Sequence, residues 1–313
     1  MPLSEVYDHH WLVFDGTPGA PSGNAGVCGG FLSYIFGVGA ESRNSPMQYP
    51  EGYGYKMKGH ERWGANIHLL RTVDIADGPQ GIKDCIECKW YRGRQQGCTI
   101  EKSGSFACCG DGTFCKTTPA GKHGQAKTYF LKYTVTYTTE VSSVTPISLY
   151  VFDSSNCLIE YNIEESRSGK EHRDLCWTVP RNASGEIVFA QGHQHIGGEQ
   201  ISLLHGADHA SAVSVCDSFP TYGTADGVPG NEKGYLTAMS HCTLPKARIE
   251  EGEKICVNST YNVDPNDQRS APIPGGSHGG VMSLFYVALH LDGEPDAIAE
   301  AGGLSWVSDT PSS

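Results

Sequence analysis

The sequence predicts an all-β protein made of two tandem antiparallel β-sandwich domains, jelly-roll-like and disulfide-rich. Three observations support this fold class. Short segments of alternating apolar and polar residues recur along the 313-residue chain, separated by loops rich in Gly, Pro, Ser and Asn. The chain has no convincing pattern of a long amphipathic helix. Its 12 cysteines form an even number, as expected when cysteines pair.

The first domain is predicted to span residues 1–165. Its strands are expected at residues 9–14, 31–36, 66–75, 129–141 and 147–152. The segment between the first two strands is rich in Gly, Pro, Ser and Asn, which predicts a long surface loop. Residues 129–141 show the clearest alternation in the chain, with Leu131, Tyr133 and Val135 on one face, and predict a regular strand.

The second domain is predicted to span residues 166–313. The charged stretch 164–174 lacks apolar periodicity, so we expect a loop between the two domains there. Strands are expected at residues 186–191, 200–204, 234–239, 254–258 and 281–291. Because these strands are short and separated by turn-rich loops, as in the first half, they predict a second sandwich.

Charge and apolar content limit the partners of the protein. The formal net charge is −12 and no Lys/Arg-rich run is present, which argues against binding to nucleic acid. No apolar run is long enough to cross a bilayer, so no transmembrane segment is predicted.

The cysteines and two glycosylation sequons, at Asn182 and Asn258, indicate an oxidising compartment and predict a secreted glycoprotein. The start of the chain lacks the pattern of a signal peptide. We therefore expect a mature or truncated chain, in which the first domain lacks its N-terminal strands.

Six of the cysteines lie between Cys85 and Cys115. A zinc knuckle is one interpretation, because Cys85 and Cys88 have the spacing of a ligand pair. The adjacent Cys108 and Cys109 do not fit a second regular pair. We therefore favour a loop held by disulfides.

Histidines follow a pattern that indicates metal binding. His193 and His195 follow an apolar run, and on an extended strand both side chains point to one face. His9 and His10 open another strand, which must be twisted or bulged if both are to reach one metal. His68 lies within a third predicted strand.

A late Met282 completes an ordered set that resembles the copper ligands of peptidylglycine α-hydroxylating and dopamine β-monooxygenases. Almost end to end, the chain also resembles the plant stress-up-regulated nodulin (nodulin-19-like) family, whose name implies a stress response. The segments that carry this second resemblance are 9–11, 37–41, 108–109, 131–135 and 192–198.

The resemblance implies two copper ions per chain. His9, His10 and His68 would hold an electron-supplying copper, and His193, His195 and Met282 a copper that binds O₂ beside the substrate. Imidazole suits copper in both oxidation states, whereas thioether favours Cu(I). The implied activity is hydroxylation of an sp³ C–H bond in a small-molecule or peptide substrate, with ascorbate as the external reductant.

The expected substrate pocket departs from that of the peptidylglycine hydroxylases. Those enzymes grip the substrate carboxylate with an Arg, an Asn and a Tyr, and the matching positions here are Gln191, Leu284 and Tyr286. Without the Arg, a carboxylate loses its charge-assisted bidentate partner. We therefore expect a substrate other than peptidylglycine.

Two other functions compete with this interpretation. Residues 275–279 satisfy the Gly-x-Ser-x-Gly pattern of serine hydrolases, but Pro272 and Pro274 precede them and a β-like run follows, so the required strand–turn–helix context is absent. The more serious alternative is a non-catalytic, secreted copper-binding stress protein, which would bind copper without consuming O₂ in the presence of ascorbate.

Overall fold

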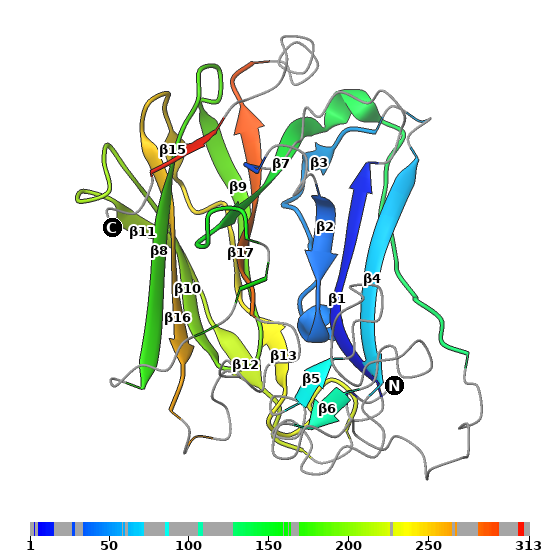
Figure 1. The fold of residues 1–313 in the computed structure, drawn as a ribbon. Coiled ribbons are helices and arrows are strands. Elements are labelled where there is room, and N and C mark those ends of the chain that lie inside the picture. The colour runs from blue at the N-terminus through cyan, green and yellow to red at the C-terminus, as the bar shows by residue number, and fades with distance from the viewer. Residues whose placement is uncertain are drawn as a thin grey trace.

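A computed structural model gives the fold of the protein (Figure 1). The residues that the structure describes are 3, 6–15, 27–28, 34–57, 59, 62–71, 85–87, 106–108, 128–158, 160–161, 163, 169–225, 228–264, 267, 281–293 and 306–309. The predicted all-β class is confirmed, because the helical turns within these ranges are the short 3-10 turns η1 (Ala40–Arg43) and η4 (Val141–Ser143). The described part of the chain contains no helix long and apolar enough to span a membrane.

Three main sheets are stacked as layers (Figure 1). The outer sheet has the order β11 (Val213–Ser218), β10 (Gly198–Gly206), β16 (Lys254–Asn262), β8 (Lys170–Thr178), β18 (Val307–Ser308). The central sheet has the order β14 (His241–Thr243), β9 (Gly185–Gln194), β17 (Ser283–Leu291), β7 (Thr145–Asp153), β3 (Tyr53–Tyr55), with β15 (Arg248–Ile249) also pairing with β9. The N-terminal sheet has the order β2 (Tyr34–Val38), β1 (Val6–Asp15), β4 (Trp63–Arg71).

Two small hairpin-like pairs complete the described strands. They are β12 (Pro220–Tyr222) with β13 (Leu236–Met239), and β5 (Cys85–Glu87) with β6 (Phe106–Cys108). The pairing of β3 with β7 is parallel, whereas the central pairs β17 with β7 and β17 with β9 are antiparallel. In the central sheet, β3 and β7 precede residue 165, whereas β9 and β17 follow it. This one sheet therefore contains strands from both sides of the predicted domain boundary.

The central strands are apolar on both faces because a sheet covers each of them. On β17, Phe285 and Val287 pack in the core shared with the outer sheet, whereas Leu284 and Tyr286 pack toward Leu12 of the N-terminal sheet. This explains why residues 284–289 form an uninterrupted apolar run rather than an alternating one.

Disulfides join the layers and the strands. Cys216 on β11 pairs with Cys242 on β14 and so connects the outer sheet to the central sheet. Cys176 on β8 pairs with Cys256 on β16, directly opposite in the ladder. A third disulfide, Cys28–Cys157, spans 129 residues of sequence.

The strand predicted at residues 129–141 is wrong. Residues 128–138 have no assigned strand, and most of their apolar side chains are exposed, Phe130 by 87% and Tyr137 by 81%. Alternation of apolar and polar residues makes a segment compatible with a β-strand. A strand forms only where the edge of a sheet pairs with the backbone N–H and C=O groups of that segment. The predicted loop at 164–174 is also partly wrong, because β8 begins at Lys170 and runs through Asp174.

Other predicted strands are confirmed with shifted ends. The strand expected at 31–36 is β2, and those expected at 147–152, 186–191, 200–204, 234–239, 254–258 and 281–291 are β7, β9, β10, β13, β16 and β17. The strand expected at 66–75 is β4, as far as the described residues extend. Most of the segment between Cys85 and Cys115 lies outside the described residues, as do the hydrolase-like residues 275–279.

Candidate metal centre

A β-bulge on β1 presents the first two histidines. The ladder between β1 and β4 pairs Asp8 with Leu69 and then His10 with His68, so His9 is an extra residue in β1. The predicted bulge is thereby confirmed. It allows two neighbouring residues, which would face oppositely on a regular strand, to lie side by side, with their Nδ1 atoms 3.1 Å apart.

The second pair of histidines lies on and just after the end of β9. His193 is within the strand and His195 follows its last residue, Gln194, and both side chains are buried. Their ring centroids are 5.2 Å apart, as the two-residue spacing predicts for side chains on one face. The hydroxyl of Tyr261 accepts a hydrogen bond from the His195 backbone N–H and donates one to the Met282 carbonyl, which ties the two segments together.

The five histidines form one continuous cluster between the N-terminal and central sheets. The His9 ring lies 4.7 Å from that of His68, centroid to centroid, and 4.4 Å from that of His195. The His10 and His68 rings are 5.0 Å apart. The sequence pattern implied two separate sites, whereas here the two histidine sets are in direct contact.

Glu160 is a potential ligand that the sequence did not suggest. One Nδ1 or Nε2 atom from each of His9, His10 and His68 and one carboxylate oxygen of Glu160 all lie within 4.8 Å of one another. The Glu160 carboxylate is 3.8 Å from Nδ1 of both His9 and His10. No sequence pattern singles out Glu160, which lies just after the loop fixed by the Cys28–Cys157 disulfide.

Glu41 is a second unforeseen contributor. Its carboxylate lies 2.5 Å from Nδ1 of His193, and both side chains are only 2% exposed. Burial raises the pKa of Glu41, but the charge and hydrogen bond of His193, together with backbone donors, outweigh burial and lower it. Among the described residues, the buried Nε2 of His193 has no hydrogen-bond partner. A carboxylate on Nδ1 and a spare Nε2 form the usual arrangement of a metal-ligating histidine.

The carboxyl group of Asp8 is close enough to Glu41 and His193 to interact with both electrostatically. Burial, followed by the nearby charge of Glu41, raises the pKa of the Asp8 carboxyl to about 7. The electrostatics of the centre therefore combine several imidazoles with buried carboxyl groups, a combination that favours a bound cation.

Of the expected pocket residues, Tyr286 lies beside the cluster, with its ring centroid 6.5 Å from that of His193, and Met282 packs in the same apolar cluster as Tyr286. Met282, Leu284 and Tyr286 are buried together with Leu12 and Val151, which confirms that the three β17-side residues share a face. Gln191 is opposite Tyr286 in the ladder of β9 and β17, and its buried Oε1 has no hydrogen-bond partner in the described part of the chain.

The remaining described histidines have other surroundings. His205 and His209 contact Glu253 and Asp174, respectively, and His290 contacts the Pro146 carbonyl. His172 contacts the Thr260 hydroxyl, and the His241 ring packs against that of Phe189. His60 and His278 lie outside the described residues.

The fold and this centre define a class: an all-β, disulfide-bonded protein of three layered sheets, with a largely buried cluster of histidines that is a candidate metal site. Imidazole nitrogen, with carboxylate oxygen nearby, suits a transition metal better than magnesium or calcium.

The chain belongs to the stress up-regulated Nod 19 family, whose sequence profile matches residues 1–291. No curated protein matches the chain.

Proposed function

We propose that this protein binds copper at the histidine cluster and is a secreted, ascorbate-dependent monooxygenase acting on an sp³ C–H bond. The observation that carries the proposal is the convergence of five histidines from two sheets on one region, four of them buried and His68 half-buried, with Glu41 hydrogen-bonded to His193. The three described disulfides support an oxidising compartment.

The proposed ligands differ between the two sides of the cluster. His9, His10 and His68, with Glu160, offer nitrogen and oxygen donors. His193 and His195 offer nitrogen, and the proposal adds the soft sulfur of Met282, which favours the reduced ion. Copper, when bound, would supply one-electron chemistry and O₂ activation.

The protein's own residues would orient the reaction and exclude water. The Glu41 carboxylate accepts a hydrogen bond from Nδ1–H of His193, which would leave Nε2 as the ligand atom. Tyr261 fixes the backbone of His195 relative to that of Met282. Burial of Leu284 and Tyr286 keeps the adjoining wall dry.

The wall next to Met282 indicates the chemical character of the substrate. It is apolar through Leu12, Val151 and Leu284, with the amide of Gln191 as a neutral polar group. Such a wall fits an apolar or neutral substrate better than a carboxylate, which needs a charge-assisted partner. We therefore propose a substrate other than a glycine-extended peptide.

A non-catalytic copper-binding function is the second candidate. One observation favours it: the His9 and His195 rings are in contact, 4.4 Å between centroids, so the cluster offers one compact group of donors. A compact polyhistidine group suits retention of a metal even where no substrate reacts.

The test combines copper content with O₂ uptake under ascorbate in the wild type, His195→Ala and Met282→Ala. Two coppers in the wild type, about one in His195→Ala, and loss of uptake in both variants would support the monooxygenase. His172→Ala, at an exposed histidine bonded to Thr260, is the matched control and should behave as the wild type. Copper binding without O₂ uptake would favour the non-catalytic function, and absence of copper would refute both.

A further inference from the structure

The Cys176–Cys256 disulfide lies on the face of the outer sheet that points away from the central sheet, where both cysteines are buried, Cys176 being 2% and Cys256 0% exposed. Its neighbours Leu175, Trp177 and Val257 point into the core between the outer and central sheets. Because side chains alternate along a strand, Cys176 and Cys256 point the opposite way, away from that core. Asp174 is two residues before Cys176 and therefore shares its face.

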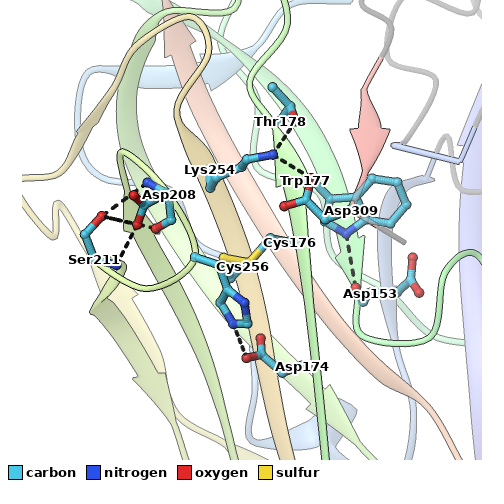
Figure 2. Close-up of a disulfide and its surroundings, with 11 residues drawn as sticks. Asp153, Asp174, Cys176, Trp177, Thr178, Asp208, Ser211, Lys254, Cys256 and Asp309 are labelled. Atoms are coloured by element: carbon cyan, nitrogen blue, oxygen red, sulfur yellow. Dashed lines mark hydrogen bonds and ion pairs between the residues drawn. A yellow bond between two sulfur atoms is a disulfide. The ribbon is translucent and has the colours of Figure 1, made fainter. Parts of the chain in front are cut away.

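A turn brings a histidine over this disulfide. The turn between β10 and β11 is held by Asp208, whose carboxylate accepts hydrogen bonds from the backbone N–H and the hydroxyl of Ser211, both 2.8 Å long. His209 follows Asp208, and its Nε2 lies 2.5 Å from the Asp174 carboxylate. Figure 2 shows Asp174 and the disulfide beside the turn that carries Asp208 and Ser211.

These groups bring together three different kinds of ligand atom. A carboxylate oxygen of Asp174, the sulfur of Cys176 and a ring nitrogen of His209 all lie within 4.8 Å of one another. Cys256 adds a second sulfur, because it is bonded to Cys176. Two thiolates, an imidazole and a carboxylate are four donors of the types that tetrahedral zinc accepts.

Stability gives little reason for His209 to be placed here. Its side chain is 61% exposed and that of Asp174 34%, so solvent screens their ion pair and the pair contributes little to folding. The turn residues 207–211 are exposed, and the turn can therefore open locally at small cost and admit a reductant. The Cys216–Cys242 disulfide differs in having an evident structural role, because it joins the outer sheet to the central sheet.

We propose that Cys176, Cys256, His209 and Asp174 form a zinc site that becomes available when a dithiol reductant opens the Cys176–Cys256 disulfide. In this step the dithiol is oxidised to its own disulfide, and its two electrons and two protons convert the S–S bond into two thiols. Zinc then binds both sulfurs as thiolates and releases the two thiol protons to solvent. His209 and Asp174 exchange their mutual contact for bonds to the metal.

The experiment uses the full chain carrying His195→Ala, which removes one member of the separate histidine cluster. Co²⁺ alone serves as the probe, because thiolate-bound cobalt gives an intense near-ultraviolet charge-transfer band. The band is recorded with the disulfides intact and after mild treatment with a phosphine reductant. We expect one additional Co²⁺ with a thiolate band in the reduced protein, displaced by Zn²⁺.

Variants assign the band to this site. In the same background, His209→Ala and Asp174→Asn change exposed side chains, so both proteins should fold. Each should weaken Co²⁺ binding in the reduced state by more than about tenfold, since even outer partners of a ligand cost that much. His172→Ala, an exposed histidine on the same strand, should leave binding unchanged.

Three results would overturn the proposal. One is a reduced protein that gains no cobalt, and another is a band that His209→Ala and Asp174→Asn leave intact. The third is a band that persists when Cys176 and Cys256 are both replaced by Ser, which would place the thiolates in other cysteines. The readout does not involve O₂ or copper, so it is independent of the proposed oxygenase activity.

Discussion

Replacing Glu41 by Gln tests whether the carboxylate of Glu41 supports the metal centre. The substitution removes one charge from a pair whose side chains are each 2% exposed and 2.5 Å apart. Removing one partner of a buried ion pair typically costs about 3–5 kcal/mol, because the other charge is left uncompensated. Gln can still accept the hydrogen bond from the His193 ring, so we expect the lower end, about 3 kcal/mol.

Urea unfolding of the metal-free protein measures this cost directly. Glu250→Gln is the matched control, since Glu250 pairs with Arg248 on the exposed surface, and it should leave the unfolding midpoint unchanged. Glu41→Asp keeps the charge but shortens the side chain, so it should fall between Glu41→Gln and the wild type. A Glu41→Gln protein with the wild-type midpoint would refute the reasoning from burial.

Copper titration of the same variants separates a positioning function of Glu41 from a purely structural one. Substitution of a partner that orients a metal-binding histidine typically weakens metal affinity by about 10–100-fold. We expect this loss in Glu41→Gln, with partial recovery in Glu41→Asp. If stability falls while copper affinity stays at the wild-type value, Glu41 serves the packing of the two layers and not the metal.

Three further substitutions test the packing around the centre. Phe285→Ala removes a fully buried ring and should cost about 3–5 kcal/mol in urea unfolding, whereas Phe130→Ala, 87% exposed, should stay within about 0.5 kcal/mol. Gly39→Ala would place a Cβ 2.5 Å from the His9 carbonyl oxygen, so we expect a loss of about 1–3 kcal/mol and weaker copper binding by titration. Tyr261→Phe removes two buried hydrogen bonds and should lower the calorimetric stability by about 2 kcal/mol; an unchanged transition would contradict the bridging function.

Local rules were sufficient for the features of the centre that depend on one strand. The period of two along β9 predicted that His193 and His195 share a face, and their rings are 5.2 Å apart. The need for two adjacent histidines to reach one region predicted that their strand is twisted or bulged, and the ladder of β1 with β4 contains a bulge, at His9.

Features that depend on how the layers dock could not be predicted in this way. Glu41 and His193 are 152 residues apart, and no periodicity relates a 3-10 turn to a distant strand. The contact of His9 with His195 likewise follows from the stacking of two sheets. The strand predicted at residues 129–141 was wrong for a related reason. The alternation of apolar and polar residues there is regular, but a strand also needs the edge of another strand to pair with, and no local pattern reveals whether one is present.

The distribution of the cluster over two layers sets an order of events during synthesis. When β1 and β4 have been synthesised, the nascent chain contains His9, His10 and His68 but not yet β9. At that stage the Glu41 carboxylate lacks its partner, the imidazole of His193. The full donor set exists only after the central sheet has formed and the N-terminal sheet has packed on it. If the proposed metal binds the complete centre, its loading would therefore be a late, post-translational step, and the bound ion would preserve the finished tertiary structure rather than guide the nascent chain toward it.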